Sequence, residues 1–377
     1  MNILYIANSR IPTEKAHGLQ IVKTIEAFIR AGENVRLLLP RRRNHITDGY
    51  RSFYHVEDNI PMTFVPNVFS FLETPFHKMY FFLQRVSFTI FAFFYGLFGK
   101  YDVIYSRELT VCFLLSIFGK MVVFEDHEPK KRFRSLYFLF VRNITKKVVV
   151  AENLLSLYKQ HDVPLDAILV APNGVDVKEF EGVSRDVRVW QSAFSFSEKR
   201  PVVLYVGHFY KWKGIYTLID AAAFIDANVC LIGGIPQDRE LVEKYIEEKG
   251  INNVYVHPFV KHHDIIRFIK SADVLVLPNT AKEERSASYT TPIKLFEYMV
   301  SGVPIVASDI ESFSAYLVDE KNALLCSPDD SVDLAKKVTT LLTDNFLGKT
   351  ISLAAYEKGC SFSWDSRASR ILSFIRS

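Results

Sequence analysis

Residues 289–309 read YTTPIKLFEYMVSGVPIVASD, and this stretch places a helix directly before a strand. Thr291 and Pro292 are residue types typical of the start of a helix. Residues 304–308, PIVAS, form a continuous apolar run of the kind found in parallel strands. Between them Glu297 stands among apolar side chains, where an unpaired charge is costly. The stretch therefore predicts an α/β unit in which Glu297 has a polar partner.

The same alternation of helix and strand signals runs along the whole chain. At 19–31, for example, apolar side chains recur with the period of one helix face. Apolar strands separated by helices imply parallel sheets covered on both faces, so we predict two doubly wound α/β domains. Residues 178–199 carry a weak strand signal and are interpreted as the connection between the domains. The predicted strands are 2–7, 34–39, 62–66, 102–106, 121–125, 147–151, 167–172, 201–207, 228–234, 253–258, 273–278, 304–308 and 323–328.

Length and composition agree with a globular protein of two domains. A chain of 377 residues is longer than one ordinary core supports. Charged residues make up 23% and hydrophobic residues 49%, which are globular values. The four cysteines (112, 230, 326 and 360) lie far apart, which suggests reduced core thiols in a cytosolic protein. Because the chain begins with a strand-like segment, no signal peptide is expected.

Basic and aromatic residues are concentrated in the first half of the chain. Residues 1–185 hold 24 Lys and Arg against 18 Asp and Glu, whereas the remainder holds 22 against 24. The longest apolar run, 86–98, is shorter than the roughly 20 residues of a membrane span. It predicts either a buried helix or a helix on a membrane surface. The basic clusters at 41–43 and 130–134 favour the second alternative.

The turns that follow the predicted strands carry the candidate chemistry, because doubly wound sheets bind ligands at the carboxyl ends of their strands. In 207–215, GHFYKWKGI, Gly207 allows backbone to approach a ligand. Lys213 precedes a helix predicted over 215–225, an arrangement that favours phosphate. A solvated loop without a function is the alternative. The chain has neither GxGxxG nor GxxxxGK[ST], which argues against a dinucleotide-dependent dehydrogenase and against a P-loop protein.

Four motifs resemble, in order and spacing, those of the family 4 retaining glycosyltransferases of the glycosyl transferases group 1 type. They are PNGVD (172–176), YVGHFYKWKGI (205–215), SADVLVLP (271–278) and TTPIKLFEYMVSGVPIVASD (290–309). The resemblance covers nearly the whole chain and implies the GT-B fold, in which two Rossmann-like domains face each other across a cleft. The implied domains are 1–185 for the acceptor and 186–360 for the nucleotide-sugar, with 361–377 as a helix that crosses back to the first domain.

The resemblance implies transfer of a sugar from a UDP- or GDP-sugar to a glycan or lipid-linked acceptor, with retention of configuration. The resemblance also implies that no metal or other cofactor is required, so the protein's task is mostly to stabilise the diphosphate leaving group and to orient both substrates. The resemblance therefore implies a cytoplasmic protein that acts in cell-envelope polysaccharide biosynthesis. No nucleic-acid partner is expected. The basic, Phe-rich first half adds an expected peripheral association with the inner face of an anionic membrane.

Site residues are carried over from the family's motifs. Catalytic roles fall to His127 near the transferred sugar, Lys213 at the diphosphate and Glu297 at the ribose. The acceptor or cleft residues are His17, Asn173 and Asp176. The donor-binding residues are Gly18, Gly207, His208, Lys213, Tyr289, Thr290, Thr291, Pro292, Ile293 and Glu297.

The sequence departs from the family at two of these positions. The family usually has arginine in place of His208, whose charge depends on pH near its ordinary pKa of about 6.5. It also has a glutamate in place of Tyr289, so this position is expected to bear on sugar specificity. Two alternatives stay open: another GT-B enzyme, such as a nucleotide-sugar 2-epimerase, or an inactive nucleotide-binding module.

Two histidine-containing segments raise the question of metal binding. Residues 125–128, Glu-Asp-His-Glu, are spaced too closely to converge on one ion. His262 and His263 are better interpreted as the start of a helix.

Overall fold

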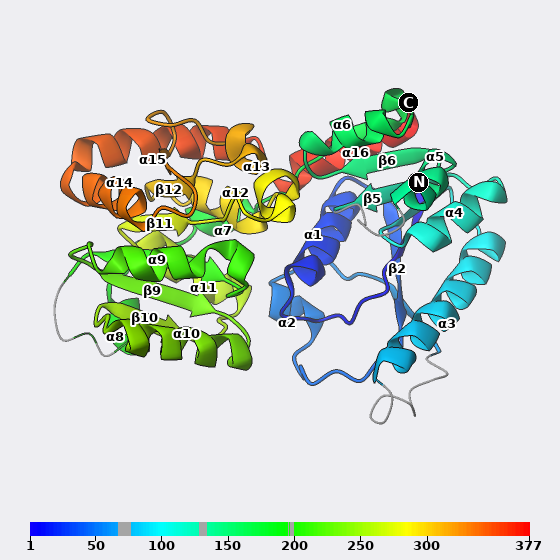
Figure 1. Ribbon diagram of the computed structural model, residues 1–377. Helices are drawn as coiled ribbons and strands as arrows, with labels where there is room; N and C mark the ends of the chain where they lie inside the picture. The colour runs from blue at the N-terminus through cyan, green and yellow to red at the C-terminus, as the bar shows by residue number, and fades with distance from the viewer. Residues whose placement is uncertain (67–76, 128–133, 195, 197–199) are drawn as a thin grey trace. The chain divides into compact units, whose positions relative to one another are not determined.

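The computed structural model spans residues 1–377 and describes all of them except 67–76, 128–133, 195 and 197–199 (Figure 1). Glu128 and most of the basic cluster at 130–134 therefore lie outside the described residues. The chain divides into two compact units, each with its own sheet. Unit 1 comprises Met1–Pro172 and Trp364–Ser377, and unit 2 comprises Asn173–Ser363.

Unit 1 is built on a parallel sheet of seven strands in the order β3-β2-β1-β4-β5-β6-β7. The order reverses between β1 and β4, so crossovers run in opposite directions from this point and cover opposite faces of the sheet. Figure 1 shows α1 and α3 on opposite faces. The strands are β1 (Asn2–Ile6), β2 (Asn34–Pro40), β3 (Met62–Val65), β4 (Val103–Ser106), β5 (Val122–Asp126), β6 (Lys146–Val149) and β7 (Ile168–Val170).

The helices of unit 1 include the last helix of the chain, α16, which packs against α1. Arg30 of α1 pairs with Asp365 of α16 at 2.7 Å, and Ile371 and Leu372 of α16 are buried. The helices are α1 (Ala16–Arg30), α2 (Tyr50–Tyr54), α3 (His77–Phe98), α4 (Leu109–Ile117), α5 (Arg134–Arg142), α6 (Asn153–Gln160), the 3-10 turn η2 (Leu165–Ala167) and α16 (Trp364–Arg376).

Unit 2 repeats the plan with a parallel sheet of six strands in the order β10-β9-β8-β11-β12-β13. Here the order reverses between β8 and β11. Its strands are β8 (Val202–Gly207), β9 (Asn228–Gly233), β10 (Val254–His257), β11 (Val274–Leu277), β12 (Ile305–Ser308) and β13 (Leu324–Cys326).

Most helices of unit 2 lie between its strands, whereas two short ones precede β8 and two longer ones follow β13. They are α7 (Val177–Glu181), α8 (Arg188–Ala193), the 3-10 turn η3 (Lys211–Lys213), α9 (Ile215–Ala222), α10 (Pro236–Lys249), α11 (His262–Ser271), the π turn η4 (Arg285–Tyr289), α12 (Ile293–Met299), α13 (Glu311–Ser314), α14 (Ser331–Thr343) and α15 (Asn345–Cys360).

All thirteen predicted strands are present, and both sheets are parallel, so the predicted doubly wound fold class is confirmed. Every strand of the two sheets carries buried apolar side chains, apart from β7, whose residues are half-buried. Cys112, Cys230 and Cys326 are buried free thiols, as predicted, whereas Cys360 is only half-buried.

The predicted connection at 178–199 is wrong, because most of it packs on unit 2. Phe180 of α7 and Trp190 of α8 are buried in the same apolar cluster as the strands of that unit. The division between the units consequently falls after Pro172 rather than at 185, and unit 2 extends to Ser363 rather than to 360.

Two helix starts also differ from the prediction. Helix α1 begins at Ala16, three residues before the helical pattern predicted at 19–31, so Gly18 lies in its first turn. Helix α12 begins at Ile293 with Pro292 as its N-cap, because Pro292 has an extended backbone with ψ of 141°. Thr291 therefore does not cap the helix as predicted.

Candidate functional site

The loop after β8 lies at the point where the strand order of unit 2 reverses, which is where doubly wound sheets bind ligands. Two glycines shape this loop: Gly207, which was predicted as a site residue, and Gly214. Gly207, the last residue of β8, has φ of 138°, and Gly214 has φ of 71°. A Cβ on Gly214 would lie 1.6 Å from the carbonyl oxygen of Pro278, which follows β11. Glycine at 214 therefore lets the loop lie directly on the end of β11.

Lys213 stands at the end of η3 in this loop and is only 9% exposed. Its Nζ lies 3.9 Å from the centroid of the Trp212 ring, a cation–π contact. Burial, and after it the nearby charge of Arg285, lowers the pKa of Lys213 to about 7. The predicted diphosphate lysine is therefore an enclosed ammonium group at the carboxyl edge of the sheet.

Lys294, in the first turn of α12, was not predicted as a site residue. Its side chain as a whole is half-buried, but its Nζ has essentially no exposed surface and no hydrogen-bond partner among the described residues. The Nζ lies 3.7 Å from the centroid of the Tyr205 ring. Burial, then the charge of Lys213, lowers the pKa of Lys294 well below its ordinary value, while Glu297 acts in the opposite direction.

Glu297 follows Lys294 by one helical turn and is 5% exposed. Its Oε1 lies 2.6 Å from Nε2 of His262, the first residue of α11. Nδ1 of His262 lies 3.9 Å from a carboxylate oxygen of Glu179 in α7. His262 does start a helix, as predicted, but it is also the polar partner that the buried Glu297 requires. No sequence pattern predicts this pair, because 35 residues separate its members.

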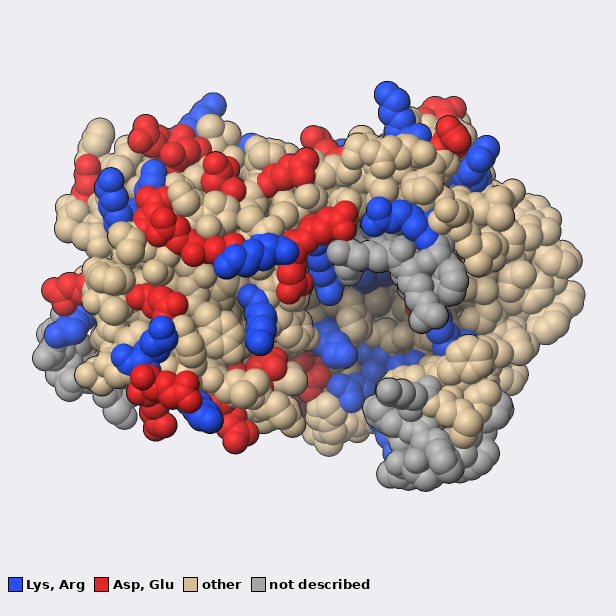
Figure 2. Space-filling view, in the orientation of Figure 1, with Lys and Arg blue, Asp and Glu red and all other residues tan. Residues whose placement is uncertain are grey.

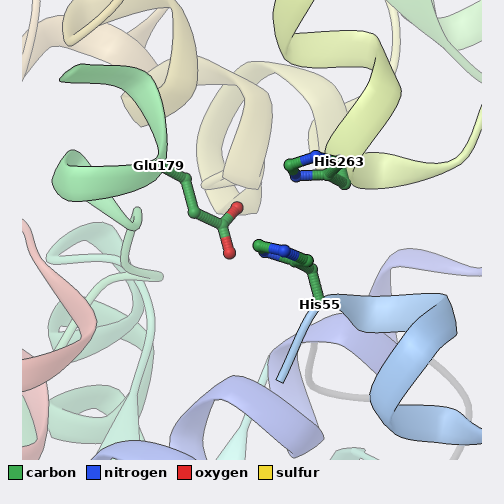
Figure 3. A group of neighbouring side chains, drawn as sticks. All are labelled: His55, Glu179 and His263. Atoms are coloured by element: carbon green, nitrogen blue, oxygen red, sulfur yellow. The ribbon is translucent and has the colours of Figure 1, made fainter. Parts of the chain in front are cut away.

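Glu179 also lies beside the second histidine of α11. A carboxylate oxygen of Glu179 and a ring nitrogen of His263 are within 4.8 Å of each other, and Figure 3 shows both side chains on facing parts of α7 and α11. Both helices belong to unit 2, so this contact fixes the start of α11 next to α7.

His208 opens a row of aromatic rings that leads to Lys213. The rings of His208 and Tyr210 stack with centroids 5.0 Å apart, and those of Tyr210 and Trp212 are 6.1 Å apart. Arg285 lies over the same Trp212 ring at 4.9 Å. The predicted His208 therefore belongs to the same loop cluster as Lys213, and Arg285 is a cation that the sequence prediction missed.

The turn before α12 holds the remaining predicted residues of unit 2. Asn173 donates a hydrogen bond from Nδ2 to the carbonyl oxygen of Thr291 at 2.7 Å, so it holds the turn that contains Thr290. Tyr289 ends the π turn η4, and its hydroxyl donates to Oε1 of Glu284 at 2.8 Å. A carboxylate thus stands beside Tyr289 after all, supplied from five residues earlier. Asp176 occupies the N-cap position of α7.

A second polar cluster lies in unit 1 around Glu125, near the carboxyl end of β5. Gln20 donates to its Oε1 at 2.5 Å, Tyr105 donates to its Oε2, and Nη2 of Arg367 lies 3.1 Å from Oε2. Burial favours the neutral acid, but Arg367, followed by His127, more than offsets it, so the pKa of Glu125 lies well below its usual range. Glu125 is therefore an ionised carboxylate, and both of its oxygens have partners within the protein.

The two predicted histidines of unit 1 border this cluster. His127 places Nε2 2.5 Å from Oε1 of Glu125, and His17 places Nε2 2.8 Å from the hydroxyl of Ser9. Burial first, and then the charge of Arg107, lowers the pKa of each histidine to about 4. Because Glu125 is ionised, Nε2 of His127 carries the proton of their hydrogen bond. His17 and His127 are therefore neutral polar groups at the carboxyl edge of the sheet.

The other predicted features of unit 1 have partners within the fold. Gly18 donates its N–H to the carbonyl oxygen of Lys15, and a Cβ at this position would lie 2.2 Å from the hydroxyl oxygen of Tyr54. Glycine is thus required here for packing. Asp126 accepts a hydrogen bond from Tyr158 at 2.6 Å, so it and Glu125 face different protein partners.

Comparison with known proteins identifies the type of fold and family. Residues 186–358 match the family model described as glycosyl transferases group 1. An uncharacterized glycosyltransferase of Methanocaldococcus jannaschii is 21% identical over 267 residues, which cover 71% of this chain and 69% of the relative. A D-inositol 3-phosphate glycosyltransferase of Paenarthrobacter aurescens is 26% identical over 232 residues, 58% of this chain and 54% of the relative. The chain thus spans about half the length of several curated relatives.

Solved structures match over the full chain. Sucrose-phosphate synthase from Thermosynechococcus elongatus superposes with a TM-score of 0.77 at 18% identity and covers 100% of this chain and 98% of its own. HepE of Anabaena, solved with UDP and glucose, superposes with a TM-score of 0.76 at 18% identity. The match covers 100% of this chain and 99% of HepE. At this level of identity the likeness shows the fold. Residues 186–358 therefore resemble the glycosyl transferases group 1 family, and the chain as a whole has the GT-B fold.

Proposed function

We propose that this protein is a glycosyltransferase that takes a UDP- or GDP-sugar at the carboxyl edge of the unit 2 sheet. The observation that carries the proposal is Lys213, an enclosed ammonium group in a loop shaped by Gly207 and Gly214 at the reversal point of the strand order. Enclosed cations at such a point suit a diphosphate. The structure of HepE with UDP supports a nucleotide donor for this fold.

The proposed chemistry is transfer with retention of configuration and without a metal ion. The resemblance to retaining enzymes supports retention. Lys213 supports a metal-free reaction, because a fixed cation can stabilise the charge that develops on a departing diphosphate. Glu297 is proposed to bind the ribose hydroxyls. The acceptor, a glycan or lipid-linked intermediate, is assigned to unit 1, where His17 and His127 stand together.

Thermal unfolding with UDP, GDP, ADP and their sugars tests the donor. A ligand that binds only the folded protein adds RT ln(1 + [L]/Kd), or about 2.7 kcal/mol at a hundredfold excess over Kd. We expect one uridine or guanosine diphosphate to raise Tm and adenosine diphosphate to have a smaller effect. If none of them raises Tm, the donor site is wrong. Sugar-nucleotide turnover without an acceptor would instead indicate an epimerase, and binding without any turnover an inactive module.

An apolar surface of unit 1 supports a membrane-associated acceptor. Ring contacts join three helices, with Phe93 of α3 5.3 Å from Phe118 and Phe113 of α4 4.2 Å from Phe140 of α5. Figure 2 shows the side of the molecule formed by α3 and α4 with almost no charged side chains. The exposed apolar residues of this surface are Phe81, Phe82, Val86, Ile90, Phe94, Phe98, Ile117, Phe118, Leu136 and Leu139.

Helix α3 is longer than the apolar run predicted from the sequence. By length and composition, Met79–Phe98 could cross a membrane, although core helices of soluble proteins pass the same test. Phe88 and Ala92 are buried, whereas Phe82 and Phe94 are exposed, so the helix has an inner and an outer face. We therefore propose that the outer face lies on a lipid surface rather than that the helix spans it.

Flotation with vesicles tests this proposal. We expect the protein to float with vesicles that contain anionic lipid at low salt, and Phe82→Asp with Phe94→Asp to abolish flotation. Phe346→Asp, at an even more exposed apolar residue of α15 in unit 2, is the control and should float like the wild type. Wild-type protein that stays in the soluble fraction would contradict the proposal.

A further inference from the structure

Two lysines of unit 2 are brought to one place from distant parts of the chain. Lys213 ends the loop after β8, and Lys294 lies in α12. The Nζ of Lys294 is 3.7 Å from the point where a Cβ on Gly207 would stand. The ammonium group of Lys294 therefore lies at the end of β8, next to the loop that carries Lys213.

The described residues offer these two ammonium groups few favourable polar contacts. Lys294 Nζ is enclosed without a hydrogen-bond acceptor, and both groups face aromatic rings, Trp212 and Tyr205. Cation–π contacts compensate only a part of what an ammonium group loses when it leaves water. The carboxylate that favours the charged form of Lys294 belongs to Glu297, which already pairs with His262.

The charge of Lys213 also makes Lys294 less favourable as a cation. The charged groups that act on the pair are Arg285 of η4 and Glu297 of α12, with His262 of α11 behind Glu297. The nearby hydroxyls of Tyr205 and Tyr298 are directed elsewhere, since Tyr205 donates to the carbonyl oxygen of His208 and Tyr298 accepts from the backbone N–H of Val206. The site thus holds more cationic groups than anionic partners.

We propose that Lys213 and Lys294 form one anion-binding site that holds the diphosphate of the donor, and that the site takes up a proton when the diphosphate binds. This proposal adds Lys294 to the proposed donor site, and it rests on the proposed function for the identity of the ligand. Two ammonium groups can donate to different oxygens of one diphosphate. A purely structural role for Lys294 is the competing explanation, in which its carbon chain fills space and its nitrogen has no ligand.

The lowered pKa of each lysine supports the proton uptake. With a pKa near 7, Lys213 is largely neutral at pH 8 in the free protein, and the pKa of Lys294 also lies well below its ordinary value. A bound diphosphate favours the charged form of each, so their pKa values rise on binding. The complex consequently binds protons that the free protein does not.

Titration calorimetry at pH 8 tests the site with three probes: UDP, uridine and inorganic pyrophosphate. We expect Lys294→Met to lower the affinity for UDP and for pyrophosphate at least tenfold. Its affinity for uridine should stay within twofold of that of the wild type. Lys244→Met, which removes an exposed lysine of α10, is the matched control and should bind all three probes like the wild type. Unliganded Lys294→Met should melt at or above the wild-type temperature, because methionine fills the site without a charge.

The outcomes separate the two proposals. Wild-type affinity of Lys294→Met for both UDP and pyrophosphate overturns the anion site but leaves the donor proposal standing. Pyrophosphate binding that depends on Lys294, without any nucleotide binding, supports the anion site and overturns the donor. If the wild type binds neither probe, both proposals fall. Repeating the UDP titration in Tris and HEPES measures proton uptake, and equal heats in the two buffers overturn that part.

Discussion

At the scale of single residues, Lys213 and Glu297 are the two predicted positions whose geometry best fits donor binding. Both are buried on the same edge of unit 2, one as a cation and the other as a carboxylate. Lys213→Ala and Glu297→Ala should each lower donor affinity or turnover at least tenfold, since a loss of about 1.4 kcal/mol corresponds to a factor of ten. Initial-rate kinetics with varied donor measure this.

Glu297→Gln is the informative companion, because glutamine keeps the shape and can still hydrogen-bond to His262. Its folding should remain close to that of the wild type, while the proposed contact with the ribose should be weakened. Wild-type kinetics in both Lys213→Ala and Glu297→Ala would mean that the site has been assigned to the wrong residues.

The lowered pKa of Lys213 also predicts how the stability of the free protein depends on pH. In the unfolded chain lysine keeps its ordinary pKa of 10.5, whereas in the fold it lies near 7. Between these values the unfolded state binds more protons, so this residue makes the free energy of unfolding rise with pH. Compared with Lys213→Met, wild-type protein should gain in Tm from pH 7 to 9.5. A difference in Tm that stays constant over this range would show that Lys213 keeps its ordinary pKa.

Sequence alone identified Lys213 and Glu297, since each stands in a motif with local meaning. It missed Lys294 although this residue lies in the same motif. The role inferred for Lys294 depends on its contact with Gly207, which belongs to another strand, and motif spacing does not report such contacts. His262 was missed for the same reason.

At the scale of elements, α16 is held to the rest of unit 1 by a buried ion pair. Arg367 contacts Glu125 at 3.1 Å, donates to the carbonyl oxygen of Pro172 at 2.9 Å and donates to Thr24 at 3.1 Å. Removing one member of such a pair leaves an uncompensated charge and costs about 3–5 kcal/mol. Arg367→Met should therefore destabilise the protein by about this amount in urea unfolding, whereas Arg370→Met, on the exposed side of α16, should cost less than about 1 kcal/mol.

The double variant Arg367→Met with Glu125→Gln distinguishes a charge effect from lost packing. It removes both charges, so it should be more stable than Arg367→Met alone. An equal or greater loss of stability in the double variant would mean that packing, and not the unpaired carboxylate, is responsible.

The elements themselves divide into those that sequence predicts well and those that it does not. Strands such as β8 and β12 are short, continuous apolar runs, a pattern that is easily told from that of an amphipathic helix. All the strands of both sheets were predicted for this reason. By contrast, α7 and α8 are too short for a helical period to emerge, although Phe180 and Trp190 tie them to the core of unit 2. The start of α12 shifted by one residue because the extended backbone of Pro292 delays the first turn.

At the scale of the whole molecule, the division into two units predicts two unfolding events with different sensitivities. The proposed donor residues Lys213, Lys294 and Glu297 belong to unit 2, and the pair of Arg367 and Glu125 belongs to unit 1. Calorimetry of Arg367→Met should show a low-temperature transition from unit 1 that UDP leaves unchanged, and a second transition that UDP moves upward. The affinity of this variant for UDP should stay within twofold of the wild type, because no donor contact has been altered. A single transition that shifts as a whole with UDP would show instead that the two units unfold as one cooperative body.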